Sequence, residues 1–161
     1  MSMRAPIFAL LLWTLLTACG GGSDPGTGGQ PQVDATAEEL LGHDMLIQAS
    51  VTHTGSLPEA IAARYGVRRH RHGFMLVVRL TPPDGGELAS PPSHVSASVR
   101  DLRGVEQSVT LEQAAPPSSA EYVGTFQVQP PDTLTLQVDV TSAEGHTSTL
   151  RFSREIMPAQ R

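Results

Sequence analysis

The chain lacks lysine, has one cysteine and has few aromatic residues, and each shortage excludes a class of function. Without lysine it cannot form a phosphate-binding loop of the Gly-Lys-Ser/Thr type. A single cysteine allows neither an internal disulfide nor a cluster of thiolate metal ligands. Aromatic residues form only 4% of the chain, which argues against sugar clefts and single-strand nucleic-acid platforms built on stacked rings.

Catalytic motifs and the charge needed for nucleic acids are missing as well. The 11 basic residues, all arginine, face 16 acids, and the formal net charge of -5 has the wrong sign for a phosphate backbone. Neither Gly-x-Ser-x-Gly nor His-Glu-x-x-His occurs in the sequence. We therefore expect a protein that is not an enzyme, uses no cofactor and binds no nucleic acid.

Residues 1–18 have the pattern of a bacterial export signal. A basic start precedes an apolar stretch over residues 5–16, which is too short to span a membrane comfortably. The stretch leads into Leu16-Thr17-Ala18-Cys19, which resembles the lipobox of bacterial lipoproteins. This resemblance implies cleavage before Cys19, acylation of Cys19 by palmitate or a similar chain, and attachment to a membrane. Gly20, in place of aspartate, implies sorting to the outer membrane with the protein facing the periplasm.

Residues 19–43 form a predicted tether between this cysteine and the folded part. Glycine, serine and proline are frequent in its first half, and such segments behave as flexible coils. A coil of about eighteen residues holds a domain roughly 20–25 Å from its anchor on average. The acidic residues 36–41 suggest one helical turn near the end of the tether. We place a single domain at 44–161, a size that suits one hydrophobic core.

From residue 45 onward, the pattern predicts an all-β fold with one short helix. Ser56 and Glu59 have the spacing of a helix capping box, and Pro58 suits a first turn. Gly66 then ends the helix. Strands, marked by alternating apolar and polar residues, are expected at 45–53, 74–80, 95–100, 109–112, 122–128, 134–141 and 150–153, with a hairpin turn at 143–146. Seven short strands predict an antiparallel β-sandwich of immunoglobulin-like architecture.

Four stretches of the folded part share their order and spacing with a known group of proteins. They are Leu57-Pro58-Glu59 running to Tyr65-Gly66-Val67-Arg68-Arg69; Phe74-Met75-Leu76-Val77-Val78; Glu121-Tyr122-Val123-Gly124-Thr125-Phe126; and Leu134-Thr135-Leu136-Gln137-Val138-Asp139-Val140 followed by Leu150-Arg151-Phe152-Ser153-Arg154-Glu155-Ile156. In these stretches the chain resembles the exported bacterial proteins grouped as domain of unknown function 4426. The resemblance implies a β-sandwich in the cell envelope and brings no catalytic residues. Members of that family mostly carry an ordinary cleavable leader, so the lipobox sets this chain apart.

The densest charged cluster is a run of arginine and histidine between residues 64 and 72. It contains Arg64, Arg68, Arg69 and Arg71. Guanidinium groups bind phosphate and carboxylate bidentately, so the cluster is a candidate contact site for an anionic headgroup or an acidic envelope protein. The plainer interpretation is a solvated loop whose charge discourages strand pairing.

Two histidines in the same run suggest a metal site as an alternative. His70 and His72 point to one side if the segment is extended. His94 or His146 would then supply a third ligand of a copper or zinc site. The flanking arginines repel a cation, so surface histidines without a metal are the plainer interpretation.

These observations favour an envelope lipoprotein whose sandwich has a non-catalytic binding or structural role. A periplasmic copper- or zinc-binding module that uses surface histidines is the alternative, and a hydrolytic enzyme ranks third. The expected partners are the membrane, through Cys19, and an envelope protein or an anionic headgroup.

Overall fold

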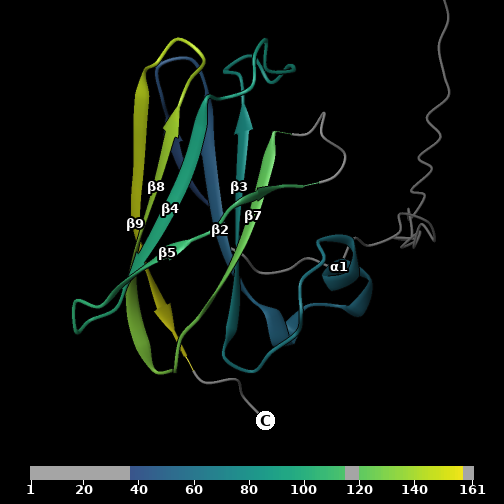
Figure 1. Cartoon of the computed structure of the whole chain (residues 1–161), viewed down its shortest axis with the longest axis vertical. Helices are drawn as coiled ribbons and strands as arrows, with labels where there is room; N and C mark the ends of the chain where they lie inside the picture. The colour runs from purple at the N-terminus through teal and green to yellow at the C-terminus, as the bar shows by residue number, and fades with distance from the viewer. Residues whose placement is uncertain (1–36, 115–119, 158–161) are drawn as a thin grey trace, which may run out of the picture. The chain divides into compact units, whose positions relative to one another are not determined.

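The computed structural model describes residues 37–114 and 120–157, which form a sandwich of two antiparallel sheets (Figure 1). Cys19, the leader and residues 20–36 of the predicted tether lie outside the described residues. In chain order, the described elements are β1 (Glu38–Leu41), β2 (Leu46–His53), η1 (Thr54–Ser56), α1 (Glu59–Arg64), β3 (Gly73–Thr81), β4 (His94–Arg100), β5 (Glu106–Val109), β6 (Glu112–Gln113), β7 (Glu121–Gln127), β8 (Asp132–Thr141) and β9 (Thr147–Ile156). One sheet has the order β1-β2-β3-β7-β6 and the other the order β5-β4-β8-β9. The predicted all-β antiparallel sandwich is confirmed.

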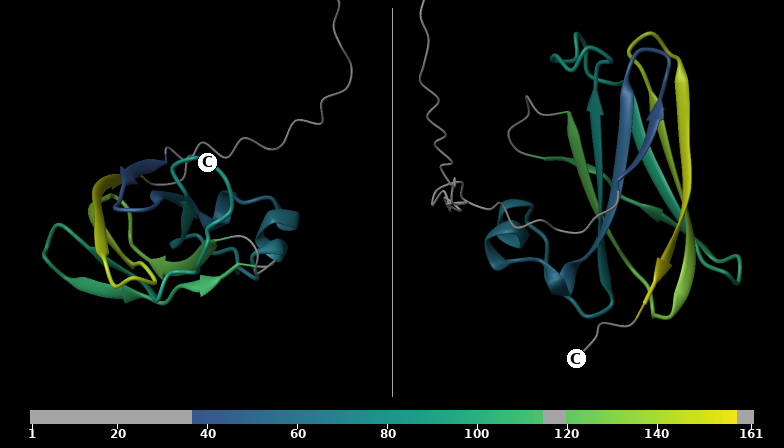
Figure 2. Two further views of the ribbon diagram at one scale, coloured as in Figure 1. Left: turned by 90° about the horizontal axis from the view of Figure 1, so that it is seen from above. Right: turned by 180° about the vertical axis from the view of Figure 1, so that it is seen from behind.

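The strand registers give the sandwich two distinct ends. At the lower end in Figure 1, β2, β4, β7 and β9 finish, and β3, β5 and β8 begin. The segment between β2 and β3, which includes η1 and α1, and the β4–β5 turn both belong to the lower end. The upper end carries the β1–β2, β3–β4 and β8–β9 connections. The view from behind in Figure 2 shows the same division.

The core lies between the two sheets and follows the period-two alternation of the sequence. Its centre consists of fully buried side chains, among them Leu76 and Val78 of β3 and Leu134, Leu136 and Val138 of β8. Each such side chain stabilises the fold by about 1.5–3 kcal/mol on burial. Apolar packing between the sheets is therefore the main source of stability in this disulfide-free domain.

A second apolar cluster attaches α1 to the outer face of the first sheet, as the ribbon in Figure 2 shows. The cluster consists of Leu57, Ala62, Met75 and Val123, with Ile61 and Tyr65 at its border. Ile61 and Tyr65, four residues apart, therefore share the face of α1 that packs on strands β3 and β7, inside the sheet and not at its edge. With six residues, α1 is short, and no helix in the described residues could cross a membrane.

The prediction of a helical turn at 36–41 is wrong, because residues 38–41 form strand β1. β1 pairs antiparallel with residues 46–49 of β2, and Leu40 packs against the core. The sheet therefore extends into the segment 19–43 that was predicted to be tether. Pairing with a neighbouring strand overrides the weak helical tendency of these acidic residues.

The single strand expected at 109–112 is also wrong, because the chain changes sheets at this point. Val109 ends β5 in the second sheet, and Glu112 begins β6 in the first. The crossing passes so close to β7 that a Cβ on Gly124 would lie 2.5 Å from the carbonyl oxygen of Thr110. Glycine is thus required at this close approach. This break and β1 account for the nine described strands in place of the predicted seven.

The predicted capping box does not form. α1 begins at Glu59 after Pro58, and no side chain caps its first turn. The hydroxyl of Ser56 instead donates to the carbonyl oxygen of His53, 2.8 Å away. Ser56 belongs to the tight turn η1, which comes between β2 and the helix and keeps this serine away from the helix start.

At both lateral edges of the sandwich, side chains of one sheet contact residues of the other sheet. On one side, the guanidinium group of Arg154 in β9 lies 3.5 Å from the carboxylate of Glu38 in β1. On the other side, the amide of Gln107 in β5 donates to the carbonyl oxygen of Gln127 in β7, 3.2 Å away. The edge strands of one sheet are thus connected to strands of the other.

Candidate functional site

The arginine segment, residues 64–72, begins where α1 ends and runs to the start of β3. The amide of Gly66 donates to the carbonyl oxygen of Ala63 at 3.1 Å, and that of Val67 donates to Ala62 at 2.8 Å. Gly66 has φ +63, the left-handed conformation that this type of helix ending requires. The predicted end of the helix at Gly66 is confirmed. The conformation of Gly66 turns the chain, and with it the following arginines, away from the helix axis.

A buried hydroxyl fixes the backbone of the arginine segment. Thr54 is 1% exposed, and its Oγ1 accepts the amide of His70 at 3.0 Å. The same hydroxyl donates toward the carbonyl oxygens of His70 and Gly73, each 3.1 Å away. The ring of His53 binds the carbonyl oxygen of Arg71 at 2.8 Å. A Cβ on Gly73 would lie 2.5 Å from Thr54 Oγ1, so the close contact depends on glycine.

The four arginines predicted as contact residues are all exposed, but they differ in their partners. The guanidinium group of Arg64 lies 5.7 Å from the ring centroid of Tyr65. Arg69 donates to a backbone carbonyl oxygen of η1 at 2.9 Å. Within the described residues, the side chains of Arg68 and Arg71 make no hydrogen bond, ion pair or ring contact. These two guanidinium groups are therefore available to bind an anion.

A groove of about 790 Å³ lies beside the arginine segment on the outer face of the first sheet. Its walls and floor include Arg68 and Arg69 on one side, Ser108, Thr110 and Glu112 on the other, and Thr125 and Gln127 below. The second wall is the stretch of chain that crosses between the sheets over Gly124. Hydroxyl, amide and guanidinium groups line the groove, and they can donate hydrogen bonds to a phosphate or carboxylate.

Tyr65 ties the arginine segment to the sheet through a buried carboxylate. Its phenol donates to Oε1 of Glu121 at 2.9 Å, and Arg79 donates to Oε2 at 2.7 and 3.2 Å. Burial, and then the hydrogen bond to Glu121 and its negative charge, raise the pKa of Tyr65, against a smaller opposing effect of Arg64 and Arg79. The role of Glu121 could not be predicted from the sequence, because its partner Tyr65 lies 56 residues away in the chain.

The histidines considered as metal ligands lie at opposite ends of the sandwich. The rings of His70 and His72 have centroids 5.8 Å apart at the lower end, but Nδ1 of His70 accepts the amide of His72 at 3.2 Å. His94 begins β4 at the upper end, where the ring of His146 lies 4.2 Å from that of His43. The expected three-histidine set is not assembled. The described residues contain no group of three or more His, Cys, Asp or Glu side chains placed to hold a metal.

Comparisons with known proteins agree with this fold. A family model described as Domain of unknown function (DUF4426) matches residues 30–158. PA0388, a DUF4426 family protein from Pseudomonas aeruginosa PAO1, is similar with a TM-score of 0.62 and 18% identity over 77% of this chain and 97% of that chain. A copper-bound variant of FetP from uropathogenic Escherichia coli strain F11 is similar with a TM-score of 0.50 and 7% identity, over 78% and 97%. A search of curated proteins finds no match.

Proposed function

Because the chain belongs to the DUF4426 family, whose function is unknown, we propose a role from its own residues: a lipid-anchored envelope protein with a non-catalytic binding module. Cys19 is the anchor, and the arginine segment with its groove is the contact site for anionic groups. The anchoring rests on the lipobox and on the tether that follows it. Retention at the outer membrane, facing the periplasm, follows from Gly20.

The observation that carries the binding role is the contrast between paired and unpaired arginines. Arg79 binds Glu121 at 2.7 Å, and Arg100 binds Glu106 at 2.5 Å. Arg68 and Arg71, by contrast, have no side-chain partner in the described residues, and both belong to the segment whose backbone Thr54 and His53 hold. A rigid backbone that presents free guanidinium groups beside a polar groove suits a carboxylate- or phosphate-bearing partner.

The anchoring is tested with the Cys19→Ser variant in the native host. Wild-type protein is expected to incorporate labelled palmitate and to fractionate with the outer membrane, because acyl chains on Cys19 hold it there. The variant is expected to take up no label. A Cys19→Ser protein that still fractionates with membranes and is cleaved at the same bond contradicts the lipoprotein assignment.

The contact site is tested by photo-crosslinking in cells. A photoreactive amino acid replaces Thr125, which is exposed on the groove floor, or Thr135, which is equally exposed on the other sheet. We expect an adduct, either to an envelope protein or to a lipid, from position 125 only, and its loss when Arg68→Glu and Arg71→Glu are added. The same adduct from both positions, or none from position 125, contradicts the proposed binding role.

Metal binding is the second candidate, and the separation of 5.8 Å between the rings of His70 and His72 favours it. One similar structure is copper-bound, but at 7% identity this likeness concerns the fold. Calorimetric titration of the full chain with copper or zinc tests the idea. Heat of binding that disappears in His70→Ala with His72→Ala supports it, and heat that depends on His43 and His146 instead contradicts it.

A further inference from the structure

The lower end of the sandwich carries most of the exposed apolar side chains. Among the described residues, the large apolar side chains that are exposed are Leu41 (66%), Leu102 (75%), Val105 (60%) and Met157 (63%). Leu102 and Val105 lie in the β4–β5 turn, and Met157 follows β9, so three of these four belong to the lower end. Scattered exposed leucines need no explanation, but a concentration of them at one end of a protein does.

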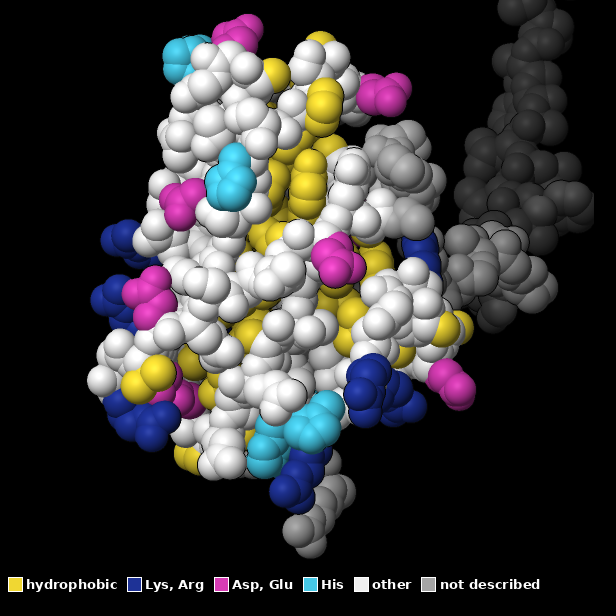
Figure 3. Space-filling model, viewed as in Figure 1, with side chains coloured by type: hydrophobic (Ala, Val, Ile, Leu, Met, Phe, Trp, Pro, Cys, Tyr) yellow, Lys and Arg dark blue, Asp and Glu magenta, His cyan; other side chains and the backbone are white. Residues whose placement is uncertain are grey.

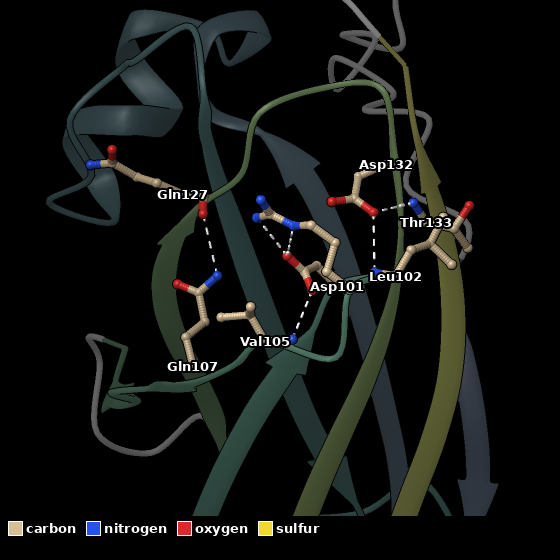
Figure 4. A network of polar contacts seen from close by, with 8 residues as sticks. Asp101, Leu102, Val105, Gln107, Gln127, Asp132 and Thr133 are labelled. Carbon is tan, nitrogen blue, oxygen red and sulfur yellow. Dashed lines mark hydrogen bonds and ion pairs between the residues drawn. The ribbon is translucent and has the colours of Figure 1, made fainter.

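The side chain of Asp101 accepts hydrogen bonds within the β4–β5 turn, whose apolar residues are exposed to solvent (Figure 4). Oδ1 of Asp101 accepts the amide of Val105 at 2.8 Å, and Oδ2 accepts the guanidinium group of Arg103 at 2.8 and 3.0 Å. Asp132 accepts the amide of Leu102 at 3.4 Å. Desolvation acts to raise the pKa of Asp101, but the hydrogen bonds from Arg103 and Val105 outweigh it and lower this pKa. The turn is therefore a defined structure that presents Leu102 to solvent.

The connections of the lower end are mainly basic, whereas those of the upper end are acidic. The lower connections contain Arg64, Arg68, Arg69, Arg71 and Arg103 against Glu59 and Asp101. The described connections of the upper end contain Asp44, Asp84, Glu87 and Glu144 and no arginine. Figure 3 shows most of the visible arginine side chains in the lower half of this face, where acidic side chains lie among them, and acidic side chains without arginine at its top. The apolar turn thus lies at the same end of the domain as the arginine segment.

We propose that the lower end docks on an anionic phospholipid bilayer, with Leu102 and Val105 in the interface and Arg68 and Arg71 against lipid phosphates. Apolar side chains flanked by basic ones are the combination that binds a membrane surface. This inference rests on the proposed function, since it uses the same arginine segment and names its partner. An acidic protein segment would need the arginines alone and would leave the apolar turn without a role.

The anchor makes a weak contact of this kind effective. A domain tethered at Cys19 meets the bilayer at the high local concentration that a short flexible linker provides. Docking then fixes the orientation of the domain on the membrane, so that the upper end, with its acidic connections, faces away from the lipid.

The test follows a fluorescent probe on the lipidated full-length protein in vesicles. The acylated Cys19 does not react with thiol reagents, so Leu102→Cys provides a single labelling site. We expect blue-shifted emission when the vesicles contain phosphatidylglycerol and an aqueous spectrum when they contain phosphatidylcholine alone. Leu41→Cys is the matched control, because Leu41 is similarly exposed at the upper end, and its probe is expected to stay aqueous.

Charge variants in the Leu102→Cys background complete the test. A basic side chain near an anionic surface contributes about fivefold, so Arg68→Gln with Arg71→Gln lowers the docking equilibrium roughly thirtyfold. Arg151→Gln, on the outer face of the second sheet, is the control and is expected to change nothing. Unchanged thermal midpoints show that each variant is folded.

The outcomes separate this inference from the proposed function. An aqueous probe in phosphatidylglycerol vesicles, combined with a protein adduct from position 125 in cells, overturns the bilayer contact and keeps the binding role. An aqueous probe with no adduct overturns both. Equal blue shifts with and without phosphatidylglycerol, or at both labelled positions, also overturn the bilayer proposal, because binding would then not depend on the basic end.

Discussion

The two ends of the sandwich are built on the same strands and nevertheless differ in charge and in construction. At the lower end, the long connection between β2 and β3 is pinned by side chains, above all by Thr54, and it presents arginines. At the upper end, residues 82–93 are rich in proline and glycine, and a backbone bond from Gly85 to Pro82 closes the turn. The strands form the core, and the connections at each end decide what that end can bind.

This difference shows how a chain with a net negative charge can carry a locally basic segment on its surface. The overall balance of -5 excludes a basic protein, but it says nothing about where the arginines lie. Three of the four strand arginines are paired with carboxylates, as Arg100 is with Glu106, and the fourth, Arg151, donates to the uncharged amide of Gln137. The arginine side chains without a partner in the described residues lie in a connection, where no side chain of a neighbouring strand faces them.

The largest expected effect concerns the pinning of the lower end. Thr54→Val keeps the shape of the side chain but removes the hydroxyl that satisfies the backbone of His70 and Gly73. We expect a loss of about 2 kcal/mol in the free energy of unfolding, because buried backbone groups lose their partner. Ser142→Ala is the matched change at the upper end, where an equally buried hydroxyl accepts only the amide of His146 at 3.3 Å. If urea denaturation shows equal losses of unfolding free energy for the two variants, the two ends do not differ in how strongly side chains hold their connections.

A smaller loss of stability is expected when the contact between the arginine segment and the sheet, made by Tyr65, is removed. Tyr65→Phe removes the hydrogen bond to Glu121 and should cost about 1 kcal/mol at pH 8. Because its folded pKa is raised, this phenol stabilises the fold fully below its unfolded pKa of about 10, and the contribution falls as the pH rises further. The pKa of Tyr122 is raised by burial alone, so Tyr122→Phe serves as control. A similar loss at pH 8 for both variants would show that burial, and not the bond to Glu121, is what matters.

The smallest effect is local and concerns the two turns that contain aspartate. In Asp101→Asn, we expect faster hydrogen exchange at the amide of Val105, because a neutral amide oxygen replaces the carboxylate oxygen and is a weaker acceptor. The pKa of Asp101 is lowered, so its contribution is present above the usual pKa of about 4 and is lost as the pH falls through the lowered value. Asp84→Asn is the counterpart at the upper end, where Oδ1 accepts the amide of Gly86 at 3.2 Å. If exchange at Val105 stays slow in Asp101→Asn, other contacts hold the lower turn.

Strand positions were predictable because the core alternates with a period of two. In β8, apolar and polar residues alternate, and in β3 every second residue from Phe74 to Leu80 belongs to the core; both strands were predicted within two residues of their observed limits. The break at 109–112 was not predictable from periodicity, because a change of sheet preserves the alternation. The signal that could have revealed it is Gly124, a glycine inside a strand, which marks the close approach of another backbone.

The candidate site was predictable in its charge and not in its geometry. Composition alone identifies the arginine run, but the distinction between Arg69, which binds the backbone, and Arg68, which binds nothing in the described residues, depends on contacts across the fold. Thr54 and Asp101 were missed for the same reason. Their partners are backbone groups whose positions exist only once the connections have folded.

The contacts that bridge the two sheets have a consequence for crowding. Anchored proteins share a surface, where copies meet more often than they do in solution, and a free strand edge in that setting can template the growth of a continuous sheet. Glu38 and Arg154 join β1 to β9 on one side, and Gln107 and Gln127 join β5 to β7 on the other. Side chains at these junctions, charged on one side and amide on the other, hinder a further strand from pairing there, which favours separate domains where copies are crowded.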